Sequence, residues 1–232
     1  MYANNETGAI QPIREIGALC RKRGVIFHTD AVQAAGHLTI NVQRDNIDML
    51  SLSAHKFHGP KGIGLLFAKS NIQLTSLIRG GGQERGKRAG TENLPSIIGL
   101  ATALKDAQEH MQQNTAYITG LRDALRNGLD KIDGAGFNGS REHCLPGTVN
   151  YSFQGVNGET LLSLLSNEGI CCSSGSACSA GSLEPSHVLL ALGLSHETAK
   201  SALRFSLCEY NTMDEVQTII TKVTEAVNRL RR

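Results

Sequence analysis

Residues 51–64 read SLSAHKFHGPKGIG, and an apolar, strand-forming run lies on either side of them, at residues 47–52 and 63–68. Lys56 therefore falls where a strand gives way to a turn rich in glycine and proline. Glycines in such a turn allow the backbone to approach a ligand closely. The pattern predicts that the amine of Lys56 is presented at the end of a strand.

Two interpretations of Lys56 remain open at this point. A lysine that forms a Schiff base with pyridoxal phosphate (PLP) needs such a position, because its amine must reach the aldehyde of the cofactor. Most lysines before a turn are instead solvated surface groups. The stretch alone favours the surface group, so the choice depends on the rest of the chain.

The composition is that of a globular protein. The chain has 232 residues, 40% of them hydrophobic, which is enough for the core of one large or two smaller domains. Its 23 basic and 21 acidic residues are spread along the sequence, so no footprint for nucleic acid is seen. The sequence has no apolar run of the roughly 20 residues that span a bilayer and no signal segment. Its six cysteines suggest neither a disulfide framework nor a paired metal motif, and we expect a cytoplasmic location.

The first hundred residues predict alternating helices and strands. The opening residues 1–8 read as the end of a strand that runs into a polar loop, so we expect the chain to start within a fold. A surface helix follows Pro12, and a short buried strand over 25–27 delivers Asp30 at its carboxyl end. Open α/β sheets bind ligands there, which makes Asp30 a candidate site residue. This stretch alone favours Asp30 as the N-cap of a helix over residues 31–35, and the two roles are compatible.

A glycine-rich charged loop and two helices occupy the middle of the chain. Residues 79–93 could present backbone amides, arginines and the hydroxyl of Thr91 to a phosphate, or could form a solvated linker. Helical periodicity over 94–113 and 115–132 predicts two helices that connect two domains, with the boundary near residue 112.

The second half predicts an α+β unit. A loop over 134–147, a strand over 148–153 and a helix over 158–167 are followed by a strand over 202–207 and an amphipathic helix over 213–230. Arg204 is an isolated charge in its strand. It could extend its charged end to solvent, or it could bind a substrate carboxylate through two hydrogen bonds.

Cys178 is surrounded on both sides by small residues, so we expect its thiol to be presented on a loop. A thiol nucleophile needs such access. Cys171 and Cys172 continue an apolar run and are expected to be buried in a strand. A zinc site made of these three cysteines and His187 has the wrong spacing.

These motifs, read in order, closely resemble the cysteine desulfurases of the NifS/IscS type, which form part of the class-V PLP-dependent aminotransferases. The resemblance extends over the whole chain, is greatest to the NifS branch, and implies the aspartate aminotransferase-like α/β fold. Residues 1–112 would be the C-terminal part of the large α/β/α domain, and residues 113–232 the small α+β domain that carries the cysteine loop. The residues that carry the resemblance are Asn5, Asp30, Gln33, residues 53–56, residues 88–93, residues 174–178 and residues 202–206.

The resemblance implies a role for each matching residue. Lys56 matches the Schiff-base lysine, and Asp30 the carboxylate that keeps the pyridine nitrogen of PLP protonated. Cys178 matches the nucleophile that takes sulfur from L-cysteine as a persulfide, so that L-alanine is released. The remaining matches are Gln33 and Asn5 near the cofactor O3′ and substrate, Ser53 and His55 on the phosphate, Thr91 on the phosphate across a homodimer interface, and Arg204 on the cysteine carboxylate.

The chain also departs from the family pattern. The family's phosphate-binding turn and ring-stacking histidine precede the segment that begins at Met1, so we expect a fragment, a truncated product or one part of a split enzyme. From the end of the sequence at Arg232 we expect no tail of the kind that IscS proteins use on their scaffold partner, and residues 207–210 (LCEY) replace the usual glycine and basic residue.

The leading hypothesis is therefore a desulfurase that supplies sulfur to an acceptor or scaffold protein for iron–sulfur assembly. The alternatives are an inactive remnant that binds or dimerises, and a selenocysteine lyase-like enzyme.

Overall fold

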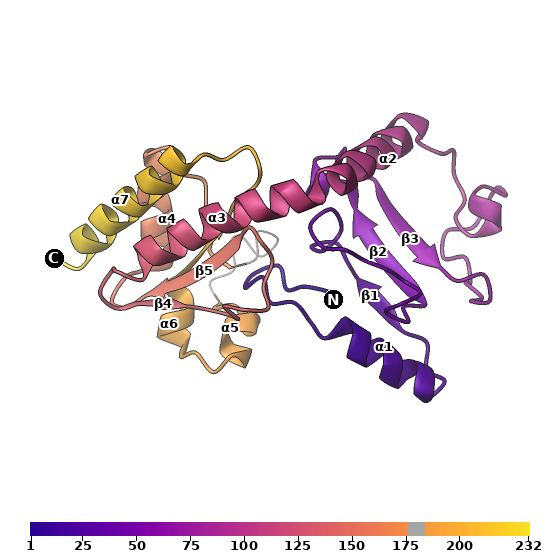
Figure 1. The fold of residues 1–232 in the computed structure, drawn as a ribbon, viewed down its shortest axis with the longest axis horizontal. Helices are drawn as coiled ribbons and strands as arrows, with labels where there is room; N and C mark the ends of the chain where they lie inside the picture. The colour runs from indigo at the N-terminus through magenta and orange to yellow at the C-terminus, as the bar shows by residue number, and fades with distance from the viewer. Residues whose placement is uncertain (176–183) are drawn as a thin grey trace. The chain divides into compact units, whose positions relative to one another are not determined.

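The computed structural model describes residues 1–175 and 184–232, which form two compact units (Figure 1). The first unit contains Met1–Tyr2 and Gln11–Met111, and the second contains Ala3–Ile10 and Gln112–Arg232. Each unit has its own three-stranded sheet. Residues 3–10 thus belong to the same unit as residues 112–232. A single boundary near residue 112 does not describe this arrangement. The identification of the units with a large and a small domain stays a prediction.

The sheet of the first unit combines one parallel and one antiparallel pair. Its strands, in the order β1-β2-β3, are β1 (His28–Asp30), β2 (Met49–Ser53) and β3 (Gly64–Ala68). β1 runs parallel to β2, with Asp30 opposite Ser51, and β3 runs antiparallel to β2. Alternate residues of β2, Leu50 and Leu52, are buried. The expected strands on either side of Lys56 are confirmed.

The expected buried strand over 25–27 is wrong, because β1 begins only at His28. Val25 and Ile26 are 55% and 60% exposed. Strand pairing starts one residue after Phe27, whose amide donates to Asp48 Oδ2 at 2.9 Å. The expected helix over 31–35 is also wrong, since these residues form consecutive turns.

The first unit has two α-helices, α1 before the sheet and α2 after it in the chain, and two short 3₁₀ helices. The helix expected after Pro12 is confirmed, and it ends with two basic residues. Gly17 lies against the Asp45 carbonyl, where a Cβ would stand 2.0 Å from the oxygen. The helical elements are α1 (Ile13–Lys22), the 3₁₀ helices η1 (Ala54–Phe57) and η2 (Glu84–Gly86), and α2 (Leu94–Glu109).

The second unit is an antiparallel sheet with helices on both faces (Figure 1). Its strands, in the order β4-β5-β6, are β4 (Ala135–Phe137), β5 (Thr148–Phe153) and β6 (Ala202–Ser206). Three longer helices cover the apolar face: α3 (Met111–Leu129, which begins in the first unit), α4 (Gly158–Asn167) and α7 (Met213–Leu230). Two short helices, α5 (His187–Ala191) and α6 (His196–Lys200), form a small cluster with Ala202 of β6.

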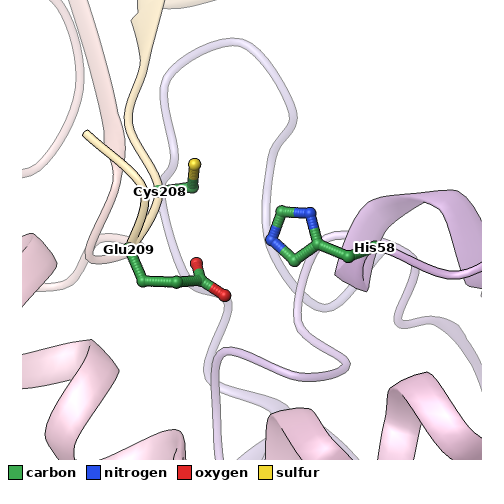
Figure 2. Close-up of side chains that lie close together, drawn as sticks. All are labelled: His58, Cys208 and Glu209. Atoms are coloured by element: carbon green, nitrogen blue, oxygen red, sulfur yellow. The ribbon is translucent and has the colours of Figure 1, made fainter.

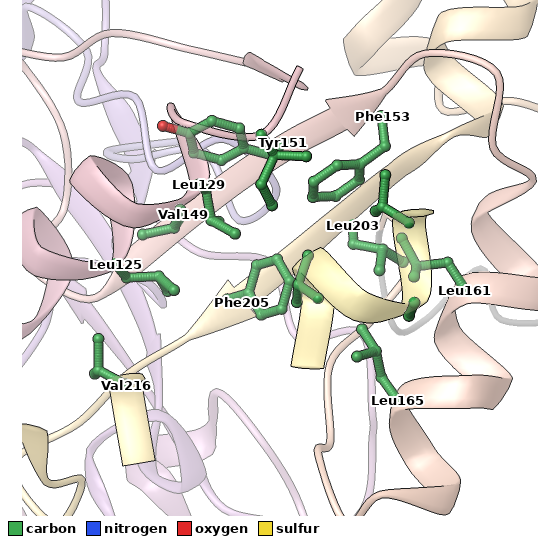
Figure 3. Packing of buried hydrophobic residues seen from close by; sticks show 14 of the residues in the cluster. Leu125, Leu129, Val149, Tyr151, Phe153, Leu161, Leu165, Leu203, Phe205 and Val216 are labelled. Atoms are coloured by element: carbon green, nitrogen blue, oxygen red, sulfur yellow. The ribbon is translucent and has the colours of Figure 1, made fainter. Parts of the chain in front are cut away.

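The core of the second unit lies between the apolar face of the sheet and the three longer helices (Figure 3). Tyr151 and Phe153 of β5 are fully buried, as is Leu203 of β6. They pack with helical leucines such as Leu125 and Leu165, both 0% exposed. Sheet and helices therefore share one hydrophobic core, and its burial is the main source of stability for this unit.

Most elements expected in the second half are confirmed, including β5, α4, β6 and α7. The expected loop over 134–147 is wrong at β4, a strand of three residues that contains a glycine. The expected burial of Cys171 and Cys172 in a strand is also wrong. Cys171 is exposed, and Cys172 is half-buried outside any strand, where burial raises the pKa of its thiol to about 11. An apolar run of two cysteines was too short to specify a strand.

We predict that Leu165→Ala lowers the free energy of unfolding of the second unit by about 2–5 kcal/mol, because it leaves a cavity between α4 and the sheet. Hydrogen exchange of the β5 amides measures this energy. Leu192→Ala is the matched control, since Leu192 is 52% exposed in the same unit. Equal losses in both variants would contradict this description of the core.

The Asp48 carboxylate predicts a pH dependence in the first unit. Its Oδ1 lies 2.7 Å from Lys69 Nζ, and this hydrogen bond is the main reason that its pKa lies below the usual value. A depressed folded-state pKa stabilises the unit above the unfolded-state pKa of about 3.9, and this stabilisation is lost as pH falls through the folded-state pKa.

Asp48→Asn should therefore cost about 1 kcal/mol at pH 7 and less at pH 3, as measured by hydrogen exchange of the β2 amides. Glu92→Gln changes the same charge at an exposed position of the same unit and should have little effect at either pH. A cost for Asp48→Asn that does not depend on pH would rule out the ion pair as its source.

Candidate active site

Lys56 is positioned by the short helix η1 that directly follows β2. Ala54 and Phe57 stand three residues apart and are 0% and 2% exposed, so this side of the 3₁₀ turn faces the core. The Lys56 carbonyl lies 3.2 Å from His37 Nε2. The backbone of Lys56 is thus fixed from both sides, while His55 is exposed and Lys56 is half-buried. The turn that the sequence predicts after β2 is thus a turn of 3₁₀ helix.

The parallel pairing of β1 with β2 brings Asp30 and Ser53 to one edge of the sheet. Asp30 is opposite Ser51, and Ser53 follows two residues later as the last residue of β2. The Asp30 side chain is exposed, and its Oδ1 accepts the Val32 amide at 2.9 Å. Asp30 therefore caps a turn through one carboxylate oxygen, and the other oxygen can accept a further bond.

The chemistry of this edge fits PLP. The cofactor needs an amine for its aldehyde, a carboxylate for its pyridine nitrogen and donors for its phosphate. Lys56, Asp30, and the Ser53 hydroxyl with His55 are groups of these three kinds, and all come from the carboxyl ends of two adjacent parallel strands. Oppositely charged Lys56 and Asp30 at one edge would also suit a ligand with both charges.

Two further predicted residues lie in loops of the first unit. Gln33 is half-buried in the turns that follow Asp30. Thr91 is exposed between η2 and α2, within the expected glycine-rich loop. The structure confirms that this segment is a loop, apart from the three residues of η2.

Asn5 lies in a tight turn, residues 4–8, which belongs to the second unit. Asn4 Oδ1 accepts the amides of Glu6 and Thr7, both at 2.9 Å. The carbonyl of Glu6 accepts Asn150 Nδ2 of β5 at 3.2 Å, and Asn150 is 0% exposed. The turn is therefore attached to the centre of the sheet.

Arg204 reaches this turn from β6. Its Nη1 donates to the Asn5 carbonyl at 2.8 Å, and the side chain is half-buried. The interpretation of a charge that simply extends into solvent does not hold, because the guanidinium bonds a carbonyl 199 residues earlier in the chain. The Asn5 carbonyl therefore orients one edge of the guanidinium.

Sequence reasoning missed Glu6, which lies within the same motif. Its side chain is 3% exposed, and Oε2 accepts the Ser186 hydroxyl at 2.5 Å. A buried carboxylate is uncommon without a structural or functional reason. Its position directly after Asn5 was the available signal.

Several expectations lie beyond this geometry. Cys178 lies outside the described residues, as does the zinc alternative that includes it. Figure 2 shows His58 with Cys208 and Glu209. His58 belongs to the first unit and the other two residues to the second, so we assign them no metal site.

Among the described residues, no helix has both the length and the apolar character needed to cross a membrane.

The sequence matches the model of one protein family, aminotransferase class-V, over residues 1–219. A cysteine desulfurase IscS of Clostridium botulinum (strain Hall) is 48% identical over all of this chain and 59% of its own length. A cysteine desulfurase of Nostoc sp. (strain PCC 7120) is also 48% identical, over all of this chain and 58% of its own length. The chain thus spans about three-fifths of these relatives.

Solved structures give the same result for the fold. A NifS-like protein superposes with a TM-score of 0.90 at 38% identity, covering 99% of this chain and 60% of its own. A NifS-like protein from Rickettsia africae gives a TM-score of 0.89 at 33% identity, covering 98% and 60% of the two chains.

We predict that Asn4→Ala destabilises the 4–8 turn by about 1–2 kcal/mol, since two amides lose their common acceptor. Hydrogen exchange at Glu6 and Thr7 measures this loss. Asn41→Ala removes a matching turn in the first unit, where Asn41 Oδ1 accepts the amides of Gln43 and Arg44. Faster exchange at Glu6 in the Asn41 variant would mean that the effect is not local.

Proposed function

Since the chain belongs to the aminotransferase class-V family, we propose that it forms the lysine-bearing and thiol-bearing part of a PLP-dependent cysteine desulfurase. The reaction takes L-cysteine and an enzyme thiol to L-alanine and an enzyme persulfide. The sulfur passes from one carbon–sulfur bond to one sulfur–sulfur bond, and the hydrogen of the thiol stays with the products. The activity, substrate and partners are proposals because the chain spans about three-fifths of its relatives.

The observation that carries the proposal is the arrangement of Asp30, Ser53 and Lys56 at one edge of the β1-β2 pair. When bound, PLP supplies an electron sink that allows the carbon–sulfur bond of cysteine to break. Asp30 would hold the proton on the pyridine nitrogen, and the Lys56 amine would anchor the aldehyde and move protons. Ser53, His55 and Thr91 would bind the phosphate, with Thr91 reaching the site of a second copy in a homodimer, and Gln33 would bond near the cofactor O3′.

The second unit would supply the substrate-binding and sulfur-accepting groups. Arg204, oriented by the Asn5 carbonyl, would bind the cysteine carboxylate. Asn5 itself would contact cofactor and substrate. Cys178 would accept the sulfur and deliver it to an acceptor protein for iron–sulfur assembly.

The lysine assignment can be tested without turnover. The chain is incubated with PLP, reduced with borohydride and mapped by peptide mass spectrometry. We expect the reduced cofactor on Lys56 in the wild type and its loss in Lys56→Ala, because Lys56 follows β2 at the edge of the sheet where β1 ends with Asp30. Lys61→Ala is the matched control, since Lys61 is an exposed lysine in the same turn.

Equal labelling of Lys56 and Lys61 would mean that the reagent reports surface amines, and the cofactor site would be rejected. Where Lys56 is labelled selectively, alanine formation from L-cysteine is assayed next. Cys178→Ala should then keep the Lys56 label and lose alanine release. Retained alanine release in that variant would show that another thiol accepts the sulfur.

A further inference from the structure

The two backbone amides that could bond the Lys56 carbonyl in a helix are both excluded. In an α-helix the donor would come four residues later, but that residue is Pro60, which has no N–H. In a 3₁₀ helix the donor would be Gly59, but the Gly59 amide donates to the Ala54 carbonyl at 2.9 Å. The Lys56 carbonyl at the end of η1 therefore needs a donor from a side chain.

His37 supplies this donor. Its Nε2 lies 3.2 Å from the Lys56 carbonyl oxygen, and both residues are half-buried. A carbonyl oxygen can only accept, so the proton of the bond lies on Nε2. The bond joins residues 19 apart in the chain. The backbone of the residue that carries the candidate amine is thus held by a side chain outside η1.

Close packing brings His37 to η1. The preceding residue, Gly36, has φ +81°, and a Cβ there would stand 2.8 Å from Phe57 Cβ and 3.3 Å from Ala107 Cβ. Glycine suits both the left-handed backbone and this close approach. The His37 amide donates to the Ala34 carbonyl at 3.0 Å. The turn that presents the imidazole ring is therefore itself closed and packed against η1.

The turns that end at His37 begin at Asp30. The first turn is held to β2 by the Ala31 amide, which donates to the Ser51 carbonyl at 2.8 Å. Gln33 lies between these two ends and is half-buried. One segment thus carries two of the candidate cofactor contacts, is bonded to β2 at its start, and ends in the donor that holds the lysine carbonyl.

We propose that His37 is a positioning residue for Lys56. Its hydrogen bond to the Lys56 carbonyl fixes the backbone of the lysine relative to the segment that carries Asp30 and Gln33. The bond acts on the backbone, so the amine at the end of the side chain keeps its own freedom to react. This role rests on the proposed function, because it concerns the placing of the cofactor-binding amine. The hydrogen bond itself does not, and it is measured separately.

The first measurement is hydrogen exchange of the Gly59 amide in the full chain, which reports on the turn that contains Lys56. We expect about fivefold faster exchange in His37→Ala, the factor for a hydrogen bond of about 1 kcal/mol. His37→Gln carries an amide nitrogen at a similar reach and should restore the wild-type rate. His110→Ala is the matched control, because His110 also bonds a backbone carbonyl, that of Asp106, in the same unit.

The second measurement is the ratio of reduced cofactor on Lys56 to that on Lys61 after incubation with PLP and borohydride. Release of the lysine backbone should misplace the amine relative to the other cofactor contacts, so we expect the ratio to fall about fivefold in His37→Ala. It should return in His37→Gln and stay unchanged in His110→Ala. A general loss of stability would not give this pattern, because both lysines lie in the same turn.

An unchanged exchange rate at Gly59 in His37→Ala would overturn the proposal. Faster exchange with an unchanged labelling ratio would also reject it, because His37 would then stabilise the turn without placing the amine. His37→Asn decides the matter should His37→Ala fail to fold, since its amide is too short to reach the carbonyl and should act as alanine does. Equal labelling of Lys56 and Lys61 in the wild-type chain is a separate failure, which rejects the proposed function and this role together.

Discussion

The parallel pairing of β1 with β2 is the constraint on which the candidate site depends. Antiparallel neighbours would place the carboxyl end of one strand beside the amino end of the other, and Asp30 and Lys56 would fall at opposite edges. The parallel register places Asp30 opposite Ser51, so the residues that follow both strands share one edge. Two parallel strands thus suffice to bring an acid, an amine and a hydroxyl to one edge, because the chain leaves the sheet twice on the same side.

In the second unit, a turn rather than a sheet edge connects residues from distant parts of the chain. One turn, residues 4–8, bonds to the sheet through Asn150, to β6 through Arg204 and to α5 through Ser186. None of these contacts is hydrophobic, although the core of the unit is. Apolar packing determines where the helices lie, whereas directional bonds from this turn determine how individual side chains are oriented. Apolar packing thus provides the stability of the unit, and the hydrogen bonds of this turn provide the orientation of its side chains.

The sequence predicted the elements that long or regular patterns specify. Amphipathic periodicity located α7, and the apolar runs on either side of Lys56 located β2 and β3. Short signals failed. Val25 and Ile26 are as apolar as a core strand but are exposed, because the ladder begins only at His28. The burial of Glu6 could not be predicted, since it depends on Ser186, and no local pattern reports a contact across 180 residues. The matching motifs named Asn5 and Arg204, but not the bond that joins them.

The membership of residues 3–10 in the second unit has an evolutionary and practical consequence. The polypeptide passes between the units three times, after Tyr2, after Ile10 and after Met111. A gene segment for residues 112–232 alone would therefore encode a sheet whose buried Asn150 has lost the Glu6 carbonyl. The two units cannot be shuffled as independent modules by one recombination event. Whatever rearrangement the locus undergoes, selection on the second unit also acts on the codons for residues 3–10.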